Sequence, residues 1–428
     1  MKNHLKRLPQ DFKKMLYLAS GDARRQGMNI YMVGGVVRDL LIGKRVLDLD
    51  IVVEGDAIIL VRKLASDLGL PFRRHHSFGT ATIYFRGHKI DFATARTEHY
   101  LNWGDLPKVE PSTLSRDLFR RDFTINAMAI SLNEKNYGEL IDLYNGLSDL
   151  RKGLVRVLHE KSFLEDPTRI FRAIRFERRF SFKIEETTMS LLRQAISNNI
   201  LRTVNPHRIR NEICLILKED KPLKYIRRIN RLVGFGFMDR GMKIGNFHYR
   251  LFKRIDNALQ LYYNDFFLHR EVCNYVVYLT ALLIRLSPKK LFALAEIFGF
   301  RKGERVIIFS VKKNINRIKR LNRKDIRPSS IYKILAPLSF ESIIFFYAYY
   351  PHSYLRNNIS YFFHNLAGVS LKIKGRDLKK MGLEPESVYG RVLEKLLWLK
   401  LDKGLETRVQ ELSEAEKIFR ELTRQKVR

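Results

Sequence analysis

Two aspartates, Asp48 and Asp50, are the residues whose type and spacing most directly suggest chemistry. They alternate with apolar residues in a strand-like segment, 46–53, and the two-residue period of a strand puts both carboxylates on one face. Paired carboxylates repel each other unless a cation lies between them, and Mg²⁺ is typically bound by one or two carboxylates plus substrate phosphates. The pair predicts a phosphoryl-transfer site, and a solvated strand face is the alternative.

Two other segments could complete such a site. Gly34 and Gly35 follow a short apolar strand at 29–33 and precede a helical segment, so their amides could approach a phosphate, with Arg38 one turn further on. An ordinary strand-to-helix turn is the alternative. Asp91 lies on a second predicted strand, which could pair beside the first and share its exposed face. This third carboxylate could ligate a second metal ion or activate an attacking hydroxyl.

A third segment contains Arg120, Arg121 and Asp122 in sequence. Its guanidinium groups suit phosphate or ribose oxygens, and the aspartate could hold one of them in place. The alternative is an exposed arginine–aspartate pair, which would contribute at most about 1 kcal/mol to stability.

The segment 165–180 has an arginine at every third position of a predicted helix: Arg169, Arg172, Arg175 and Arg178. Because like charges on one face repel, an acid or an anion should face them. Asp166, followed by Pro167, is expected to be the helix N-cap, with proline at the first helical position. Asp166 and Arg169 also offer an acceptor beside a donor, which matches the amine and ring nitrogen of cytosine and adenine but not guanine or uracil.

The elements that position these residues change in type along the chain. Through residue 150, strand and helix patterns alternate between glycine turns, including a hairpin of 81–86 and 89–94 around Gly87–His88 and an amphipathic first helix within 1–16. From residue 154 onward the patterns are helical. The fold class is therefore α+β, with a mixed α/β head followed by helical domains.

The composition indicates a folded protein with a polyanionic partner. The 428 residues include 79 Lys and Arg against 45 Asp and Glu, a formal charge of +34, while 45% hydrophobic residues argue against disorder. Basic runs occur at 224–231 and 301–327. Clustered aromatic residues at 261–267 and 345–355 are expected to be core residues rather than RNA-stacking residues.

Two further properties bear on location. The two cysteines, Cys214 and Cys273, exclude a disulfide framework and a cysteine-based zinc site, which favours a reducing cytoplasm. The longest apolar stretches, 275–284 and 343–350, are about half of the roughly 20 residues that a membrane-spanning helix needs, so no span is expected.

Taken together, these segments resemble the class II tRNA nucleotidyltransferases, the CCA-adding enzymes and their relatives within the DNA polymerase β superfamily. The resemblance covers the first half of the chain without a gap and a C-terminal segment, 373–404, more loosely. It depends on YMVGGVVRDLLIG and LDLDIVVEGDA (28–57), FGTATIYF and IDFATARTEHY (78–100), DLFRRDFTINAMAI (117–130), IDLYNGLSDL (141–150), EDPTRIFRAIRFERRF (165–180) and NPHRIRNEI (205–213).

The resemblance implies a role for each matching residue. Asp48 and Asp50 would bind catalytic Mg²⁺ with Asp91 as the third acid, and Glu165 would orient the base-reading pair, Asp166 and Arg169. Arg208 and Glu212 would brace the helix that carries this pair, and Asp142 and Gly146 match a hinge. The residues expected to contact the triphosphate or ribose are Gly34, Gly35, Arg38, Arg120, Arg121, Asp122, Arg172 and Arg175.

The resemblance also implies a polymerase-β-like head at 1–150, a neck with the base-reading motif at 151–220, a body at 221–328 and a tRNA-binding tail at 329–428. The expected reaction completes the 3′-CCA end of tRNA from ATP, with CTP left open as a second substrate. The acceptor stem and TΨC arm would be bound through their shape and phosphates. The N-terminal segments favour terminal A addition, after a separate CC-adding enzyme. Full CCA addition, poly(A) synthesis and non-catalytic RNA binding remain alternatives.

Overall fold

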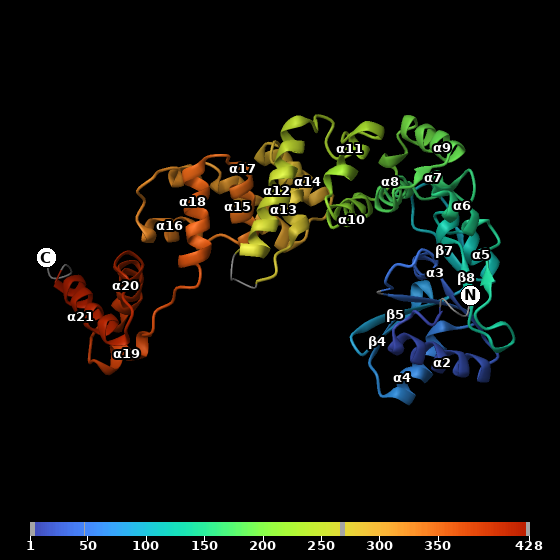
Figure 1. The fold of residues 1–428 in the computed structure, drawn as a ribbon, viewed down its shortest axis with the longest axis horizontal. Helices are drawn as coiled ribbons and strands as arrows, with labels where there is room; N and C mark the ends of the chain where they lie inside the picture. The colour runs from blue at the N-terminus through green and yellow to red at the C-terminus, as the bar shows by residue number, and fades with distance from the viewer. Residues whose placement is uncertain (1–4, 47, 266–269, 425–428) are drawn as a thin grey trace. The chain divides into compact units, whose positions relative to one another are not determined.

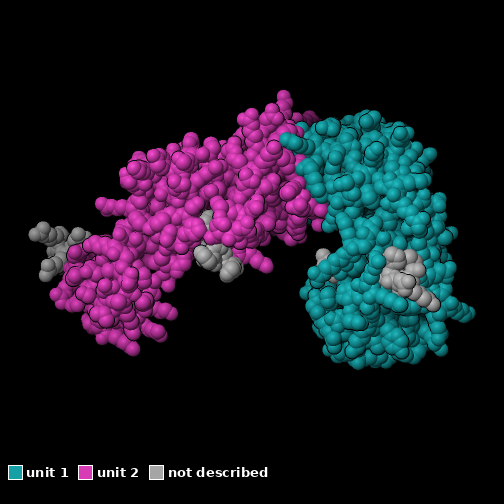
Figure 2. Space-filling model, in the orientation of Figure 1, with its two compact units in different colours: residues 1–213, 224–237 teal, residues 214–223, 238–428 magenta. Residues whose placement is uncertain are grey.

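The computed structural model describes residues 5–46, 48–265 and 270–424. The chain forms two compact units, one of residues 1–213 with 224–237 and the other of residues 214–223 with 238–428 (Figure 2). The expected sequence of a mixed head and a helical remainder is confirmed (Figure 1). The finer division at residues 150, 220 and 328 stays a prediction.

The first unit begins with a seven-stranded mixed sheet, in the order β3-β4-β5-β2-β1-β8-β9. Only β2 and β5 are parallel neighbours, and the other adjacent pairs are antiparallel. The strands are β1 (Asn29–Val33), β2 (Leu49–Glu54), β3 (Phe72–His75), β4 (Thr80–Phe85), β5 (His88–Thr94), β8 (Ala129–Ser131) and β9 (Leu140–Ile141).

Helices cover both faces of this sheet. Helices α2 (Gln10–Arg25) and α4 (Ala57–Leu68) pack against each other, and α4 packs on β4 and β5 (Figure 1). On the other face, Val33 and Val52 pack in a buried cluster with Leu114 and Leu118 of α5 (Leu114–Phe119). Since side chains alternate along β2, Asp50 lies on the same face as Val52 and therefore on the α5 side.

The structure shifts the predicted bounds of one turn, one helix and one strand by a few residues. The hairpin turn is Arg86–Gly87, both with positive φ, and His88 already pairs with Phe85, as expected for a two-residue turn that matches the twist of the strands. The first described long helix, α2, begins at Gln10 because Pro9 precedes it as the N-cap. Strand β2 begins at Leu49, and residue 47 of the predicted strand lies outside the described residues.

The remainder of the first unit consists of a small hairpin, two short parallel strands and helices. The hairpin is β6 (Arg96–His99) with β7 (Lys108–Pro111). The parallel strands β10 (Leu154–Val155) and β11 (Lys183–Ile184) are short exceptions to the helical pattern expected after residue 154. The helices are α6 (Gly146–Lys152), α7 (Ser162–Glu165), α8 (Arg169–Phe180), α9 (Glu186–Ser197), α10 (Pro206–Leu217), which continues into the second unit, and α11 (Leu223–Leu232).

The described residues of the second unit are helical. Tyr262, Phe345 and Phe346 are buried, as expected for core residues. Tyr263 and Tyr354 are exposed, so the core prediction is wrong for them, and residues 266–269 lie outside the description. The helices are α12 (Asn246–Asp265), α13 (Asn274–Leu283), α14 (Pro288–Ile297), α15 (Lys302–Asn314), α16 (Pro328–Leu335), α17 (Phe340–Tyr349), α18 (Ser353–Tyr361), α19 (Gly375–Lys380), α20 (Tyr389–Lys403) and α21 (Arg408–Arg424).

Among residues 5–46, 48–265 and 270–424, no single helix is long and apolar enough to cross a bilayer. Helices α16 and α17 reach the required length and composition only as a pair, and they are bent by 110°.

Candidate active site

Two acids lie side by side on the α5 face of the sheet. Asp50 on β2 and Asp91 on β5 are register partners across a parallel strand pair. Asp91 accepts a hydrogen bond from the Thr82 hydroxyl at 2.5 Å and pairs with Lys89. Asp48 directly precedes β2 and is exposed, like Asp50, whereas Leu49 is buried. The expectation that the strand of Asp91 lies beside that of Asp50 is confirmed, whereas the role of Asp48 stays a prediction.

This acidic group fits a divalent cation. Removal of water around Asp50 raises the pKa of its carboxyl group, and the charges of Asp91 and Asp48 raise it further against the opposing effect of Arg121 and Lys89. Among the described residues, no three His, Cys, Asp or Glu side chains converge closely enough to hold an ion by themselves. Two carboxylates that share an ion with substrate oxygens match the way proteins usually bind Mg²⁺.

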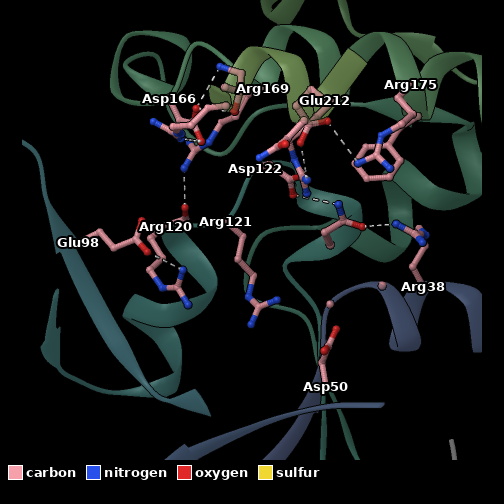
Figure 3. A pocket seen from close by; sticks show the side chains of 18 of the residues that line it. Arg38, Asp50, Glu98, Arg120, Arg121, Asp122, Asp166, Arg169, Arg175 and Glu212 are labelled. Atoms are coloured by element: carbon pink, nitrogen blue, oxygen red, sulfur yellow. Dashed lines mark hydrogen bonds and ion pairs between the residues drawn. The ribbon is translucent and has the colours of Figure 1, made fainter. Parts of the chain in front are cut away.

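Asp50 lies at one end of a cavity of about 640 Å³ lined mostly by charged groups (Figure 3). The cavity also reaches Gly34 and Gly35, the first residues of the turn into α3 (Gly35–Leu41). Gly34 has φ +76°, and a Cβ atom there would come within 2.7 Å of Nη1 of Arg121. The glycine therefore provides both the left-handed turn and the space for this guanidinium.

Arg38 is held firmly at the cavity wall. Its side chain donates to Oδ1 of Asn126 at 2.5 Å and to Asp39, and its guanidinium lies over the rings of Phe176 and Phe180, 5.2 and 4.6 Å from the centroids. Burial lowers the pKa of Arg38, with the cation Arg179 adding to that effect and Asp39 opposing it. Helix α8 thus packs directly on the arginine that follows the glycine turn.

The acid that holds Arg120 and Arg121 is Asp117, and the prediction that Asp122 holds one of them is wrong. Asp117 is fully buried and accepts from Arg120 at 2.6 Å and from Arg121 at 2.9 Å. It lies three and four residues before the two arginines on α5, the spacing at which helical side chains meet. Arg120 also donates to Glu98 at 2.9 Å.

Asp122 connects the head to α8 instead. Arg172 donates to its Oδ2 through Nε at 2.9 Å and Nη2 at 2.6 Å, and Asn126 donates to its Oδ1 at 2.9 Å. Burial raises the pKa of Asp122, but Arg172 and the hydrogen bonds outweigh that effect and lower the pKa to about 2. The carboxylate is therefore charged at neutral pH and fixes the orientation of Arg172.

Acidic groups face three arginines of α8, Arg172, Arg175 and Arg178, as expected. Glu212 of α10 lies 3.6 Å from both Arg172 and Arg175, and Arg178 pairs with its neighbour Glu177 at 3.3 Å. Burial raises the pKa of Glu212, and the two arginines oppose that shift. The brace expected of Glu212 therefore connects α10 to α8.

Asp166 lies at the same cavity, and its position corrects the capping prediction. Helix α8 begins at Arg169 with Thr168 as N-cap, so Pro167 is not its first residue. The Asp166 carboxylate accepts from the backbone amide of Thr168 at 3.0 Å and from its hydroxyl at 2.6 Å. Its other oxygen pairs with Arg208 of α10 at 2.8 Å.

Arg169 is buried beside Asp166 and anchored by neutral groups. Its guanidinium donates to Oγ of Ser162 at 2.7 Å and to the carbonyl oxygen of Arg120 at 2.7 Å. Asp166 and Arg169 both line the cavity, as Figure 3 shows. The fold therefore brings together Asp166 and Arg169, the glycine turn and Asp50, which are far apart in sequence.

Glu165 lies behind this pair and faces His159 at 3.4 Å. Burial raises the pKa of Glu165, and Glu98 adds to that shift. Burial lowers the pKa of His159 to about 4, with Arg169 and Lys161 contributing. His159 is therefore neutral in the folded protein at neutral pH.

The lowered pKa of His159 predicts a loss of stability in acid. Between pH 6.5 and about 4 the unfolded chain binds a proton at this residue and the folded chain does not, so the free energy of unfolding falls by up to about 3 kcal/mol as the pH falls. We expect His159→Gln to reduce the difference in melting temperature between pH 7 and pH 4.5. A variant with the wild-type difference would contradict this assignment.

The segment matched to a hinge is closely packed. Asp142 accepts from the backbone amides of Gly146 and Leu147 at 2.7 and 2.9 Å and so caps α6. A Cβ atom on Gly146 would lie 2.3 Å from the carbonyl oxygen of Thr124. No residue other than glycine fits this position without a shift of the backbone.

We expect Gly146→Ala to lower the free energy of unfolding by about 1–3 kcal/mol, the usual cost of inserting a methyl group into packed structure. Urea denaturation would measure the change. Gly21→Ala is the matched control, because its nearest neighbour would be a side-chain atom of Arg25 at 3.8 Å and alanine favours the surrounding helix. Equal stability of the two variants would contradict the packing argument.

Some of the site residues were not anticipated from the sequence. The position of Asp117, three and four residues before two arginines, could have predicted its ion pairs. No sequence pattern indicates the role of Asn126. Glu98, which accepts from Arg96, Arg120 and Tyr100, lies in the segment 78–100, where the sequence pattern indicates a role for Asp91 but none for Glu98. Further residues that line the cavity are Tyr100, Thr168, Phe176, Arg179 and Asn211.

The mixed sheet with its acid pair, glycine turn and arginine-lined cavity defines a nucleotidyltransferase head of the polymerase β type. Residues 30–156 match the family described as the poly A polymerase head domain. The A-adding tRNA nucleotidyltransferase of Geobacter sulfurreducens is 34% identical over 90% of this chain, but the match covers 44% of that relative. The chain thus spans less than half the length of this curated relative.

Solved structures match over nearly their whole length. The Thermotoga maritima CCA-adding enzyme complexed with tRNA has a TM-score of 0.72 and 32% identity, covering 98% of both chains. A CCA-adding enzyme in complex with ATP has a TM-score of 0.74 and 34% identity, covering 98% of this chain and 97% of that one. The chain belongs to the class II tRNA nucleotidyltransferase family.

Proposed function

We propose that this protein is a template-independent tRNA nucleotidyltransferase that adds the terminal adenosine of the 3′-CCA end from ATP. The observation that carries the proposal is that Asp50, the arginines and the pair Asp166–Arg169 line one cavity. A single nucleotide in this cavity could therefore reach both sets of residues. Asp166 and Arg169 would select its base, and the acids beside Asp50 would suit phosphoryl transfer. The Geobacter relative, named as an A-adding enzyme, supports terminal A addition.

In the proposed reaction the tRNA 3′-hydroxyl oxygen forms a bond to the α-phosphorus, and the bond from that phosphorus to the bridging oxygen breaks to release pyrophosphate. Asp166 and Arg169 would present an acceptor and a donor to the amine and N1 of adenine. Arg38, Arg172 and Arg175 would offset the charge of the triphosphate, with the amides of Gly34 and Gly35 beside it. Ribose or phosphate oxygens would be bound at the segment of Arg120–Asp122.

We propose Mg²⁺ as the metal ion, held by Asp48 and Asp50 with Asp91 as the third acid. The superfamily in general uses divalent metals. When bound, the ion would polarise the α-phosphate and favour deprotonation of the attacking hydroxyl. The register pairing of Asp50 with Asp91 supports this role, because neighbouring carboxylates repel each other and a cation between them offsets that repulsion.

The proposed RNA partner is tRNA, bound through its acceptor stem and TΨC arm by the neck, body and tail domains at 151–220, 221–328 and 329–428. The matching Thermotoga enzyme is described in complex with tRNA, and the charge of +34 suits an extended polyanion. A separate CC-adding enzyme would supply the substrate in a reducing cytoplasm, which a content of only two cysteines fits.

Full CCA addition is the second candidate, since the matching solved structures are named CCA-adding enzymes and Asp166–Arg169 suits cytosine as well as adenine. Labelled ATP or CTP with Mg²⁺ and tRNA transcripts that end at the discriminator base, at C or at CC would separate the candidates. One A added only to the CC-ended transcript supports terminal A addition, and growth of all three to CCA supports full synthesis. Unbounded A tails or no incorporation would refute both, favouring poly(A) synthesis or RNA binding without catalysis.

A further inference from the structure

Arg120 and Arg121 are adjacent in sequence, but the structure surrounds them differently. Arg120 donates through Nε and Nη2 to Oδ1 of Asp117, at 3.0 and 2.6 Å, and through Nη1 to Glu98 at 2.9 Å. Two carboxylates therefore contact this guanidinium, and each of them also contacts a second arginine, Asp117 with Arg121 and Glu98 with Arg96. Its carbonyl oxygen accepts from Arg169, so the backbone of Arg120 also anchors the base-reading residue.

Arg121 has one carboxylate contact, from Nη2 to Oδ2 of Asp117 at 2.9 Å. Its Nε is buried without a hydrogen-bond partner among the described residues, and Nη1 faces the glycine turn, as the 2.7 Å approach to a Cβ on Gly34 shows. In Figure 3 the guanidinium points into the open part of the cavity, on the side of Asp50. It retains charge and donors for a ligand.

We propose that Arg121, and not Arg120, donates to the ribose or phosphate oxygens of the nucleotide, and that Asp117 is the positioning residue that directs it there. This inference rests on the proposed function. Two guanidiniums this close repel each other, and a buried carboxylate between them offsets the repulsion and restricts both side chains. Asp117, with no exposed surface, is such a carboxylate.

The test compares Arg120→Gln, Arg121→Gln and Asp117→Asn. We expect Arg121→Gln to lower kcat/KM for ATP about ten- to hundredfold, the range for loss of a charge-assisted hydrogen bond, with a small change in melting temperature. Arg120→Gln should do the reverse and lower the melting temperature more than kcat/KM, because it removes three hydrogen bonds to the carboxylates of Asp117 and Glu98. A larger loss of kcat/KM in Arg120→Gln, once corrected for folded fraction, would overturn the proposal.

Asp117→Asn tests positioning. Its kcat/KM for ATP should also fall about tenfold or more, and adding Asp117→Asn to Arg121→Gln should cause no further loss, because both changes remove one interaction. Additive losses would show that Asp117 acts only on stability. Asp22→Asn is the matched control, since Asp22 is also buried and pairs with an arginine three residues on, in α2 outside the cavity. It should keep the wild-type kcat/KM.

Two probes identify the oxygens that Arg121 contacts. If Arg121 binds the ribose, Arg121→Gln reduces the preference for ATP over 2′-deoxy-ATP, and if it binds phosphates, it weakens inhibition by inorganic pyrophosphate. An unchanged response to both probes would overturn the proposal. Direct ATP binding by calorimetry separates this failure from failure of the proposed function, which would appear as absence of transfer by the wild-type protein.

Discussion

Asp50→Asn is expected to reduce nucleotide transfer by about a thousandfold or more while tRNA binding and folding are retained. The carboxylate lies at the cavity beside its register partner Asp91, and loss of an ion held there removes several kcal/mol of transition-state stabilisation. The proposed tRNA contacts lie mainly on the basic helical domains. Single-turnover transfer with labelled ATP and a gel-shift titration with tRNA would measure the two effects.

The stability of this variant is part of the same prediction. Asp50 is exposed and, among the described residues, accepts no hydrogen bond that anchors the fold, so the amide should leave the melting temperature nearly unchanged. Asp48→Asn is expected to cause the same loss of transfer, and Asp11→Asn, which removes an acid that pairs with Arg86 outside the cavity, is the control. Near-normal turnover by Asp50→Asn would refute the catalytic role.

Arg169→Ala is expected to relax the choice of base. One well-aligned donor–acceptor pair contributes about 1–3 kcal/mol to discrimination, so selection of ATP over GTP and UTP should fall roughly ten- to hundredfold. The ratio of kcat/KM values measures this effect independently of the fraction of folded enzyme. Unchanged discrimination would refute base reading by Arg169.

The same substitution will also lower stability, because the guanidinium is buried and anchored by Ser162 and the carbonyl of Arg120. The cost of leaving such partners unpaired is about 1–3 kcal/mol. Ser162→Ala separates the two effects, since it removes the anchor and keeps the guanidinium. Ser162→Ala should reduce the melting temperature and preserve most of the discrimination between ATP and the other nucleotides. If Ser162→Ala relaxes discrimination as much as Arg169→Ala, the packing around α7 determines selectivity instead.

The sequence by itself determined the features whose geometry is local. The two-residue period of a strand separated Asp50 from its buried neighbours Leu49 and Ile51, although Asp48 lies just before β2, and a glycine between two alternating segments marked the β4–β5 hairpin to within one residue. The change from strand to helical periodicity indicated that a mixed α/β part precedes a helical remainder. These signals depend on backbone geometry over a few residues, which neighbours in sequence largely decide.

Only the tertiary structure decided which charged groups pair. Arg172 reaches Asp122 across 50 residues of sequence, and Arg208 pairs with Asp166 from another helix. A run of arginines and scattered acids allows many pairings of similar Coulomb energy, and the fold selects among them by which side chains it buries together. For the same reason the sequence identified Arg120 and Arg121 as equivalent cations, whereas burial beside Asp117 and Glu98 made them different.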